Sequence, residues 1–369
     1  MKILLVGEYS NLHNNLKDGL LELGHECVLL SGSDGFKQLE SDVKLITHMH
    51  SVKDYLKAYL GTFRILHQIQ DDYDIIQLIN PTIVPLRMGL NRRFVNKLLT
   101  KANKSFLLLA GDDTVFWDFM KKKGKDSLRY SYLDDVYKYE LNGKMSFYDV
   151  QYNKDWNLEL AEKVDGIIPI MYEYAEAYRQ RRIDLLKSLP IPINTEKNKY
   201  HENTIQNGKL VVFHGLNRYY SKGTRFVEQA FELLKKKYPN DLELIIDGKM
   251  NYTQYVQLLS KVNVVIDQTN SYSLAVNALT SMAKGKIVLG GAEPESFKEL
   301  GYDFCPAINI TPDANQIVKQ LEILLENRKS VPEIGYQSRL FIEKYHDYKK
   351  VAQLYINHWQ GLYNKRTYQ

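Results

Sequence analysis

The chain has 369 residues, more than twice the ~150 residues of a typical domain, and its 44% apolar content is enough for two hydrophobic cores. The net charge of +5 is the small difference between 49 basic and 44 acidic residues, which argues against a nucleic-acid partner. Two cysteines far apart in the sequence provide neither a disulfide framework nor a zinc cluster, so we expect no structural metal. The first apolar run has no cleavage site behind it and no run approaches the ~18 residues of a membrane span, so we expect a cytoplasmic protein.

The first half of the chain alternates short apolar runs with helical patterns. Runs this apolar are typical of parallel strands that are buried on both faces, and the alternation with helices indicates a Rossmann-like, doubly wound α/β sheet. The strands are predicted at residues 2–7, 27–31, 74–80, 105–111 and 165–170. We assign residues 1–195 to this first domain.

The second half repeats this plan, with strands predicted at residues 209–215, 242–248, 262–268, 286–291 and 306–310. Pro190 and Pro192, followed by a polar, Asn-rich stretch, indicate a domain boundary near residues 195–207 and a second Rossmann-like domain at 207–347. Apolar residues at helical spacing in 348–369 predict a helix that crosses back to the first domain. Two such domains would face each other across a cleft, which predicts a small-molecule site.

The end of the first predicted strand lacks the motif of dinucleotide enzymes. It reads Gly7-Glu8-Tyr9-Ser10, without G-x-G-x-x-G, and G-x-x-x-x-G-K-[ST] is absent from the chain. Ordinary dinucleotide enzymes and P-loop NTPases are therefore disfavoured, although Gly7 is kept as a candidate ligand-binding residue. His13, in the turn NLHNN, is a candidate for contacting an acceptor, while capping or packing is the simpler explanation.

Asp112 and Asp113 follow the apolar run SFLLLA, at the carboxyl end of a central predicted strand. Because α/β sheets bind their ligands at this edge, both are candidate catalytic residues. The alternative is that Asp113 caps the next helix. A polymerase-type GDD motif requires a hairpin and further carboxylates, which the surrounding sequence does not contain.

Residues 87–126 concentrate ten Lys and Arg against four Asp, with Phe94 and Leu98 among the charges. This composition is suited to attraction by an anionic membrane surface. A solvated basic helix face explains it equally well.

The segment FHGLNRYYSKGTRFVEQA, 213–230, is the strongest anion-binding pattern in the chain. A buried strand ends at its start, Arg218 and Lys222 follow four residues apart, and Ser221 or Thr224 can cap the next helix. A helix N-terminus beside a guanidinium and an ammonium group is a suitable receptor for a diphosphate. A solvated basic loop is the alternative.

The segment NSYSLAVNALTSMAKGKIVLGG, 270–291, predicts a nearly buried helix followed by a strand. Ser273, Asn277, Thr280 and Lys284 recur at spacings of four, three and four, which gives the helix one polar stripe. We take the first three as candidate ligand-binding residues. Alternatively, they satisfy neighbouring backbone groups.

With these motifs the chain resembles the GT-B glycosyltransferases, particularly the retaining family 4 type, over nearly its whole length. The resemblance rests on LLELGHECVLLS, on HGLNRYYSKGTRFVEQAFELL, on VIDQ through AKGKIVLGGAEPE, and on the C-terminal helix. It implies that Arg218 and Lys222 neutralise the diphosphate of a nucleotide sugar. The two glutamates that the family carries on its donor helix correspond to Tyr272 and Thr280, and the family's active-site histidine corresponds to Gly111 or Asp112.

The resemblance further implies a metal-independent glycosyltransferase of the hexosyltransferase type, without a cofactor. Its donor would be a nucleotide sugar and its acceptor a glycan or lipid-linked molecule of bacterial polysaccharide or glycoconjugate assembly, with the enzyme at the inner face of the cytoplasmic membrane. In retaining enzymes of this fold the leaving phosphate is thought to take the acceptor proton. A sugar-nucleotide epimerase of the same fold and a non-catalytic nucleotide-sugar or glycan-binding protein are the alternatives.

Overall fold

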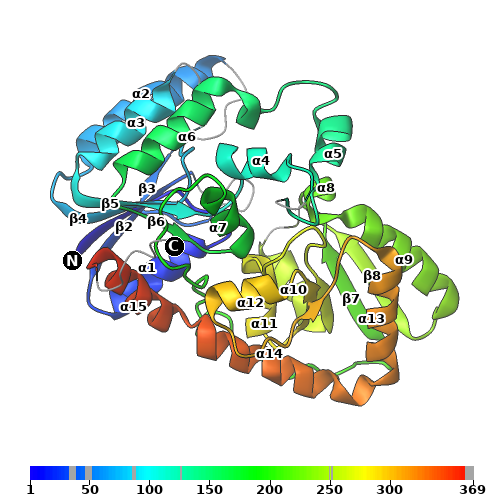
Figure 1. Ribbon diagram of the computed structural model, residues 1–369. Coiled ribbons are helices and arrows are strands. Elements are labelled where there is room, and N and C mark those ends of the chain that lie inside the picture. Colours follow the sequence, from blue (N-terminus) through cyan, green and yellow to red (C-terminus); the bar gives the residue numbers. More distant parts are fainter. Residues whose placement is uncertain are drawn as a thin grey trace. The chain divides into compact units, whose positions relative to one another are not determined.

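A computed structural model describes residues 1–32, 39–45, 52–84, 89–124, 127–248, 250 and 252–361. The chain divides into two compact units, each built around its own parallel sheet (Figure 1). The first unit comprises Met1–Phe119, Ser146–Pro192 and Tyr348–Gln369, and the second comprises Met120–Met145 and Ile193–Asp347.

The first unit contains a six-stranded parallel sheet in the order β3-β2-β1-β4-β5-β6. Its strands are β1 (Lys2–Val6), β2 (Glu26–Ser31), β3 (Val43–Lys44), β4 (Tyr73–Leu78), β5 (Ala102–Leu109) and β6 (Gly166–Pro169). The five predicted strands are confirmed, and the two-residue β3 is the addition. The central strands are buried along most of their length because helices cover both faces of the sheet (Figure 1).

The helices of the first unit form two layers (Figure 1), with α2, α3 and α6 on one face of the sheet and α1 and α15 on the other. They are α1 (Leu12–Glu22), α2 (Val52–Gln68), α3 (Leu90–Leu99), α4 (Thr114–Met120), a 3-10 turn (Phe147–Asp149), α6 (Gln151–Lys163), α7 (Tyr172–Arg179) and α15 (Tyr348–Trp359).

The C-terminal helix α15 packs on α1, which confirms that the end of the chain returns to the first domain. A methyl group on Gly19 would lie 2.4 Å from the carbonyl oxygen of Tyr348, so only glycine permits this close approach of the two helices. At the other end of α15, the Trp359 indole Nε1 donates to Gln77 Oε1 at 3.2 Å in the core. The helix ends at Trp359, and residues 362–369 of the predicted helix lie outside the described residues.

The second unit contains a five-stranded parallel sheet in the order β11-β10-β9-β7-β8. Its strands are β7 (Leu210–Gly215), β8 (Leu242–Asp247), β9 (Val264–Ile266), β10 (Ile287–Gly290) and β11 (Ile308–Asn309), as predicted. Its helical elements are α5 (Leu133–Asp135), a π-helical turn (Val136–Glu140), α8 (Tyr219–Lys222), α9 (Thr224–Lys237), α10 (Tyr252–Lys261), α11 (Val276–Ala283), α12 (Pro294–Leu300), α13 (Ala314–Glu326), a 3-10 turn (Arg328–Ser330) and α14 (Val331–Tyr345).

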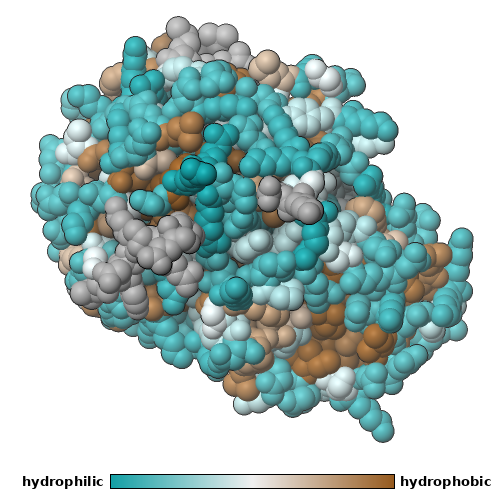
Figure 2. Space-filling view, in the orientation of Figure 1, coloured by the Kyte–Doolittle hydropathy of each residue, from teal (hydrophilic) through white to brown (hydrophobic). Residues whose placement is uncertain are grey.

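The apolar side chains of β7, β9 and β10 pack with those of α9 and α13 to form the core of the second unit. On the edge strand β8, Leu244 and Ile246 are only half-buried. Most of the surface visible in Figure 2 is hydrophilic, and apolar side chains gather around β7 and α13. Within the described residues, no helix combines the length and apolar character needed to cross a membrane.

The two units divide the chain differently from the expected boundary at 195–207. The second unit begins at Ile193, because the Asn-rich stretch after it is hydrogen-bonded into that unit and is not a free linker. Asn203 Nδ2 donates to the Asn263 carbonyl at 2.9 Å, and Arg339 donates to the Asn198 carbonyl at 2.7 Å. Residues 120–145, expected in the first domain, also belong to the second unit.

Candidate functional site

The candidate site of the second unit lies at the carboxyl edge of its sheet. The chain runs from β7 to β8 on one side and returns to β9 on the other, so the topological switch point lies between β7 and β9. The register pairs His214 with Ile266, and Ile266 with Leu289, which aligns the ends of three strands. Loops that leave such neighbouring strand ends form the ligand-binding crevice of open α/β sheets.

His214 connects the elements at this edge. It is fully buried, its Nδ1 lies 2.9 Å from the Ile266 carbonyl oxygen, and its Nε2 lies 2.9 Å from the Thr224 hydroxyl oxygen. Burial lowers the pKa of His214 to about 4, and the nearby Lys222 adds to this effect. The ring is therefore neutral near pH 7, donating from Nδ1 and accepting at Nε2, and it fixes the start of α9 against β7 and β9.

The predicted anion-binding loop forms a short helical turn before α9. Arg218 precedes α8 and is exposed, while Lys222 ends α8 and is buried. Gly223 has φ +69° and separates α8 from α9, and a methyl group on it would lie 2.0 Å from the Thr269 hydroxyl oxygen. Neither of the expected residues caps α9: Gly223 occupies the N-cap position, and the Thr224 hydroxyl is bonded to His214.

Lys222 forms a buried ion pair with Asp267, which directly follows β9. Lys222 Nζ lies 3.2 Å from Asp267 Oδ1, and the two residues are only 7% and 2% exposed. The same oxygen accepts from Asn277 Nδ2 at 3.2 Å, whereas Asp267 Oδ2 is buried without a hydrogen-bond partner. The ammonium group expected to bind a diphosphate thus already has a carboxylate counter-ion.

The polar stripe predicted on the helix within 270–291 is only partly formed. The helix α11 begins at Val276, so Ser273 lies before it, buried in a turn with Ser271. Asn277 links Asp267 to the Tyr255 hydroxyl, which donates to Asn277 Oδ1. Thr280 is half-buried one turn further along the helix. Asn277 is therefore the stripe residue that the structure joins to Lys222.

Tyr272, where the resemblance leads us to expect a glutamate, is buried against the 120–145 segment. Its hydroxyl accepts from the Arg129 backbone N–H at 2.7 Å, and the Arg129 guanidinium lies 4.9 Å from its ring centroid. Arg129 also pairs with Glu293 at 3.0 Å and with Glu295 at 2.9 Å. The Tyr130 hydroxyl donates to the second oxygen of Glu293 at 3.2 Å, so buried Glu293 is bonded at both oxygens.

The 120–145 segment also contacts the anion-binding loop. Tyr139 stacks on Tyr220 of α8 at 5.3 Å between ring centroids, with 12° between the ring planes. Asp135 pairs with Arg225 at the start of α9, at 2.9 Å. This segment is thus attached both to the α8–α9 loop and to the Tyr272–Glu293 side of the same sheet edge.

In the first unit, Gly7 and His13 have structural partners. Gly7 has φ +88°, and a methyl group on it would lie 2.3 Å from Ile79 Cγ2. His13 is fully buried, with Nδ1 2.7 Å from the Gly7 carbonyl oxygen and Nε2 3.1 Å from the Gln77 amide nitrogen. Burial lowers the pKa of His13 to about 4, so its ring is a neutral connector inside the domain. Gly7 belongs to the first unit, whereas the other donor candidates belong to the second.

Asp112 and Asp113 follow β5, as predicted, but their environments differ. Asp113 Oδ1 accepts from the Phe116 backbone N–H and Oδ2 accepts from the Tyr178 hydroxyl, both at 2.8 Å, and burial raises the pKa of Asp113 to about 6. Asp113 therefore caps the first turn of α4 and ties it to α7. Asp112 is half-buried, and its carbonyl accepts from Asn80 at 3.1 Å.

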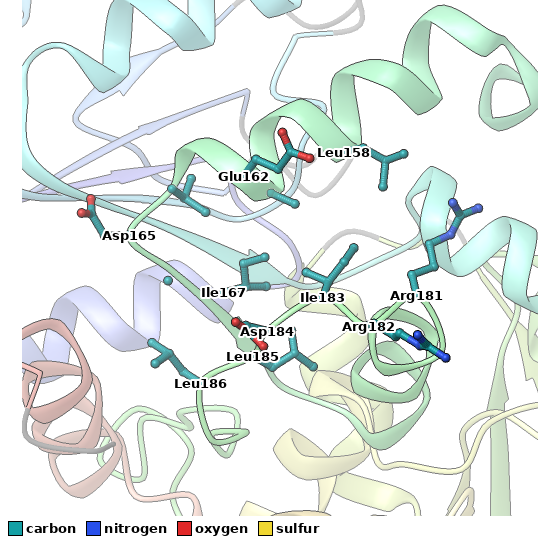
Figure 3. A pocket seen from close by; sticks show the side chains of 13 residues that line it. Leu158, Glu162, Asp165, Ile167, Arg181, Arg182, Ile183, Asp184, Leu185 and Leu186 are labelled. Carbon is teal, nitrogen blue, oxygen red and sulfur yellow. The ribbon is translucent and has the colours of Figure 1, made fainter. Parts of the chain in front are cut away.

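A pocket of about 590 Å³ lies in the first unit, between the end of α6, β6 and residues 181–186 (Figure 3). Ile167 and Leu185 are among its apolar lining residues, and Glu162 and Arg181 lie around it. It contains none of the predicted site residues. Among the described residues, no group of three or more His, Cys, Asp or Glu side chains is arranged to hold a metal ion.

The basic segment 87–126 is only partly described, because residues 87, 88, 125 and 126 lie outside the described ranges. Its helix α3 buries Phe94 and Leu98 in the core and exposes Arg93 and Lys97. The apolar side chains expected to reach a membrane from this segment are therefore engaged inside the domain.

Sequence reasoning missed three residues of the site: Asp267, Glu293 and Arg129. Asp267 has a local signal, since it is a carboxylate directly after the buried run VNVVI. Glu293 follows the next strand in GGAEPE and could have been found in the same way. Arg129 has no such signal, because its contacts with residues 272 to 295 span more than 140 positions of sequence.

Comparison with known proteins identifies the fold. No model of a protein family matches this sequence, and no curated protein matches it. Solved structures match nearly the whole chain: sucrose-phosphate synthase from Thermosynechococcus elongatus has a TM-score of 0.63 at 12% identity, covering 98% of this chain and 99% of that one. Anabaena HepE in complex with UDP-glucose has a TM-score of 0.63 at 14% identity (98% and 100% covered), and a glycosyltransferase from Rickettsia africae has 0.55 at 9% (98% and 97%). The chain therefore has the GT-B fold of glycosyltransferases.

Proposed function

We propose that this chain is a glycosyltransferase that transfers a hexose from a nucleoside diphosphate sugar to a glycan or lipid-linked acceptor. The observation that carries the proposal is the Arg218–Lys222 loop at the switch point of the second sheet, directly before the N-terminus of α9. The first N–H groups of a helix have no partners within the helix, and with two nearby cations they favour a diphosphate. HepE of the same fold was solved with UDP-glucose, which supports a nucleotide sugar as the donor.

In this proposal Arg218 binds the diphosphate from the exposed side of the loop, and Lys222 contributes from the buried side. Asp267 holds Lys222 in position and offsets part of its charge. Asn277 and Thr280 provide neutral hydrogen-bonding groups near the sugar or ribose, which are weaker than the carboxylates that the family uses. The diphosphate then contributes most of the donor's binding free energy.

The finer features of the proposal are a retaining outcome, no metal requirement and a role in bacterial polysaccharide or glycoconjugate assembly. Arg218, Lys222 and the N-terminus of α9 would carry out the charge neutralisation that a divalent cation performs in other transferases. Asp112 is the side chain of the first unit that we assign to orienting the acceptor hydroxyl, because it is half-buried at the carboxyl end of β5. Asp113 is assigned a structural role as the cap of α4.

The test is a binding and turnover panel with the full-length protein. UDP-, GDP-, ADP- and CMP-sugars are screened by thermal shift, and those that stabilise the protein are incubated with glycan and lipid-linked acceptors. Arg218→Gln should reduce binding of the selected donor about tenfold to a hundredfold, the loss of one charge-assisted hydrogen bond. Lys236→Gln, an exposed cation near the other end of α9, is the matched control and should bind normally.

The neutral residues at 272 and 280 favour one alternative, a non-catalytic nucleotide-sugar-binding protein. Donor binding that depends on Arg218, without transfer to any acceptor, would support it. Conversion of the donor to an isomer without an acceptor would instead identify an epimerase. If no nucleotide sugar binds, or if Arg218→Gln binds as well as the unmodified protein, the donor site has been assigned wrongly.

A further inference from the structure

The helix α2 (Val52–Gln68) has two apolar faces, of which the core uses only one. Ala58, Thr62 and Ile65 recur at helical spacing and are buried against the domain. A second set of large apolar side chains follows the same periodicity on another side of the helix and is exposed: Tyr55, Leu56, Tyr59, Leu60 and Phe63. An ordinary surface helix has polar residues in such positions.

This second face is a continuous surface and not a scatter of single residues. Leu56 and Leu60 are each 58% exposed and are one turn apart, and the Tyr59 and Phe63 rings pack edge to face at 4.9 Å. Among the described residues, this one helix carries five of the sixteen exposed large hydrophobic side chains. Contiguous apolar surface of this kind marks a contact site for a membrane or another protein.

Unpaired cations follow one side of the apolar face. An α-helix turns by about 100° per residue, which places Lys53, Lys57 and Arg64 on one side of α2, next to the exposed leucines. They are exposed and form no ion pair with any described residue. The neighbouring helix α3 (Figure 1) adds the exposed cations Arg93 and Lys97. Together α2 and α3 carry six Lys and Arg against one Asp.

We propose that the exposed apolar face of α2 binds the surface of an anionic lipid bilayer. A helix that lies in the membrane interface inserts an apolar face below the headgroups and keeps its cations at the anionic surface, which is the arrangement on α2. Tyrosine suits this position because its ring is apolar and its hydroxyl remains hydrated. The apolar part of this surface lies on α2, outside the segment 87–126 predicted from sequence, whose Phe94 and Leu98 are in the core. That segment contributes only the cations Arg93 and Lys97.

The charges favour a lipid surface over a second copy of the chain. In a symmetric dimer the same patch meets itself, which would bring Lys53, Lys57 and Arg64 of one copy close to those of the other. Within α2 itself, no carboxylate lies among the exposed apolar residues to offset this repulsion, since the helix's single acid is Asp54 in its first turn. An anionic bilayer supplies the complementary charge.

The test is flotation of the full-length protein with vesicles of phosphatidylcholine, with and without phosphatidylglycerol. We expect binding only to the anionic vesicles, and weaker binding at higher salt. Leu56→Ser/Leu60→Ser should reduce binding at least tenfold, because the inserted side chains become polar. Lys53→Gln/Lys57→Gln/Arg64→Gln should reduce it about fivefold for each cation removed.

Leu233→Ser/Ile323→Ser is the matched control, because these side chains are exposed to 48% and 42% on α9 and α13 of the second unit. It should float like the unmodified protein. Failure of the unmodified protein to bind anionic vesicles, or full binding by the Leu56/Leu60 variant, would overturn the proposal. So would a dimer in sedimentation analysis that the α2 variants dissociate. The outcome is independent of the proposed transferase activity, because nucleotide binding by the second unit is measured separately without lipid.

Discussion

Replacing Asp267 by asparagine removes the counter-ion of Lys222 while keeping the shape of the side chain. The asparagine oxygen can still accept from Lys222 and Asn277, so the change isolates the charge. Removing one partner of a buried pair leaves the other charge uncompensated, which costs about 3–5 kcal/mol. Because the hydrogen bonds can be retained, we expect the lower end, about 3 kcal/mol. For a unit of about 150–250 residues this lowers the melting temperature by roughly 6–12 °C.

Nucleotide should reverse much of this loss. A diphosphate beside Lys222 replaces the missing negative charge, and it no longer meets the repulsion of the Asp267 carboxylate. At an effective dielectric constant of about 20, removal of one such repulsion is on the order of 1 kcal/mol or more. UDP should therefore raise the melting temperature of Asp267→Asn more than that of the unmodified protein, and should bind it more tightly.

Thermal unfolding with and without UDP measures both effects, with Lys222→Met and the double variant completing a mutant cycle. The double variant should be more stable than the sum of the single changes predicts, because it leaves no unpaired charge. Asp241→Asn is the control: its pair with Arg328 is partly exposed, with 34% of the Arg328 and 45% of the Asp241 side chain accessible, and its loss should cost about 1 kcal/mol. Additive effects at positions 222 and 267, or equal stabilisation of both proteins by UDP, would refute this reasoning.

Three further predictions concern buried groups. Asp113 has a pKa of about 6 in the folded protein against ~3.9 in the unfolded chain, so its ionisation destabilises the fold as pH rises through 6. The free energy of unfolding should therefore fall by about 3 kcal/mol between pH 4 and pH 7. Denaturant titrations of Asp113→Asn should lack this fall. His13 and His214 have folded pKa values of about 4 against ~6.5 unfolded, so the unfolded chain takes up protons first. The free energy of unfolding should fall by about 3 kcal/mol for each as pH drops from about 6.5 to 4, and a flat profile would contradict this. Tyr272→Phe removes the acceptor of the Arg129 N–H and should speed its hydrogen exchange, whereas unchanged protection would argue against this contact.

The sheets were predictable from the sequence because each strand is a local, nearly continuous apolar run. KILLV begins with Lys2 and is followed by Gly7, LVVFHG follows Lys209 and ends at Gly215, and both became buried parallel strands. The two-residue β3 was not predictable, since Val43–Lys44 has no periodicity that distinguishes it from a loop. The C-terminal helix was predictable because its spacing is local, although its partner α1 was not specified by that spacing.

The site was less predictable because its groups come from distant parts of the chain. The Arg218–Lys222 loop has a local pattern, and it forms at the expected strand end. The partner that balances the charge of Lys222 has no local pattern in the sequence. Asp267 lies 45 residues away and reaches Lys222 only because β7 and β9 pair. The same holds for His13, whose position in a turn suggested access to a ligand, while Gln77 and the Gly7 carbonyl enclose it in the fold.

The neutral residues Tyr272 and Thr280 therefore do not leave this sheet edge without acids. At Tyr272 the chain presents a hydroxyl to Arg129, and the Glu293 N–H is bonded to the Tyr272 carbonyl at 3.0 Å. Glu293 and Asp267 both follow strand ends at this edge, and each is paired with a cation. A ligand anion that binds beside Lys222 thus enters a site whose cations already have carboxylate partners. We expect its affinity to depend on how readily it replaces these carboxylates as the partner of the cations. For this reason we expect the Lys222–Asp267 pair, more than the neutral residues at 272 and 280, to determine how strongly the site holds a diphosphate.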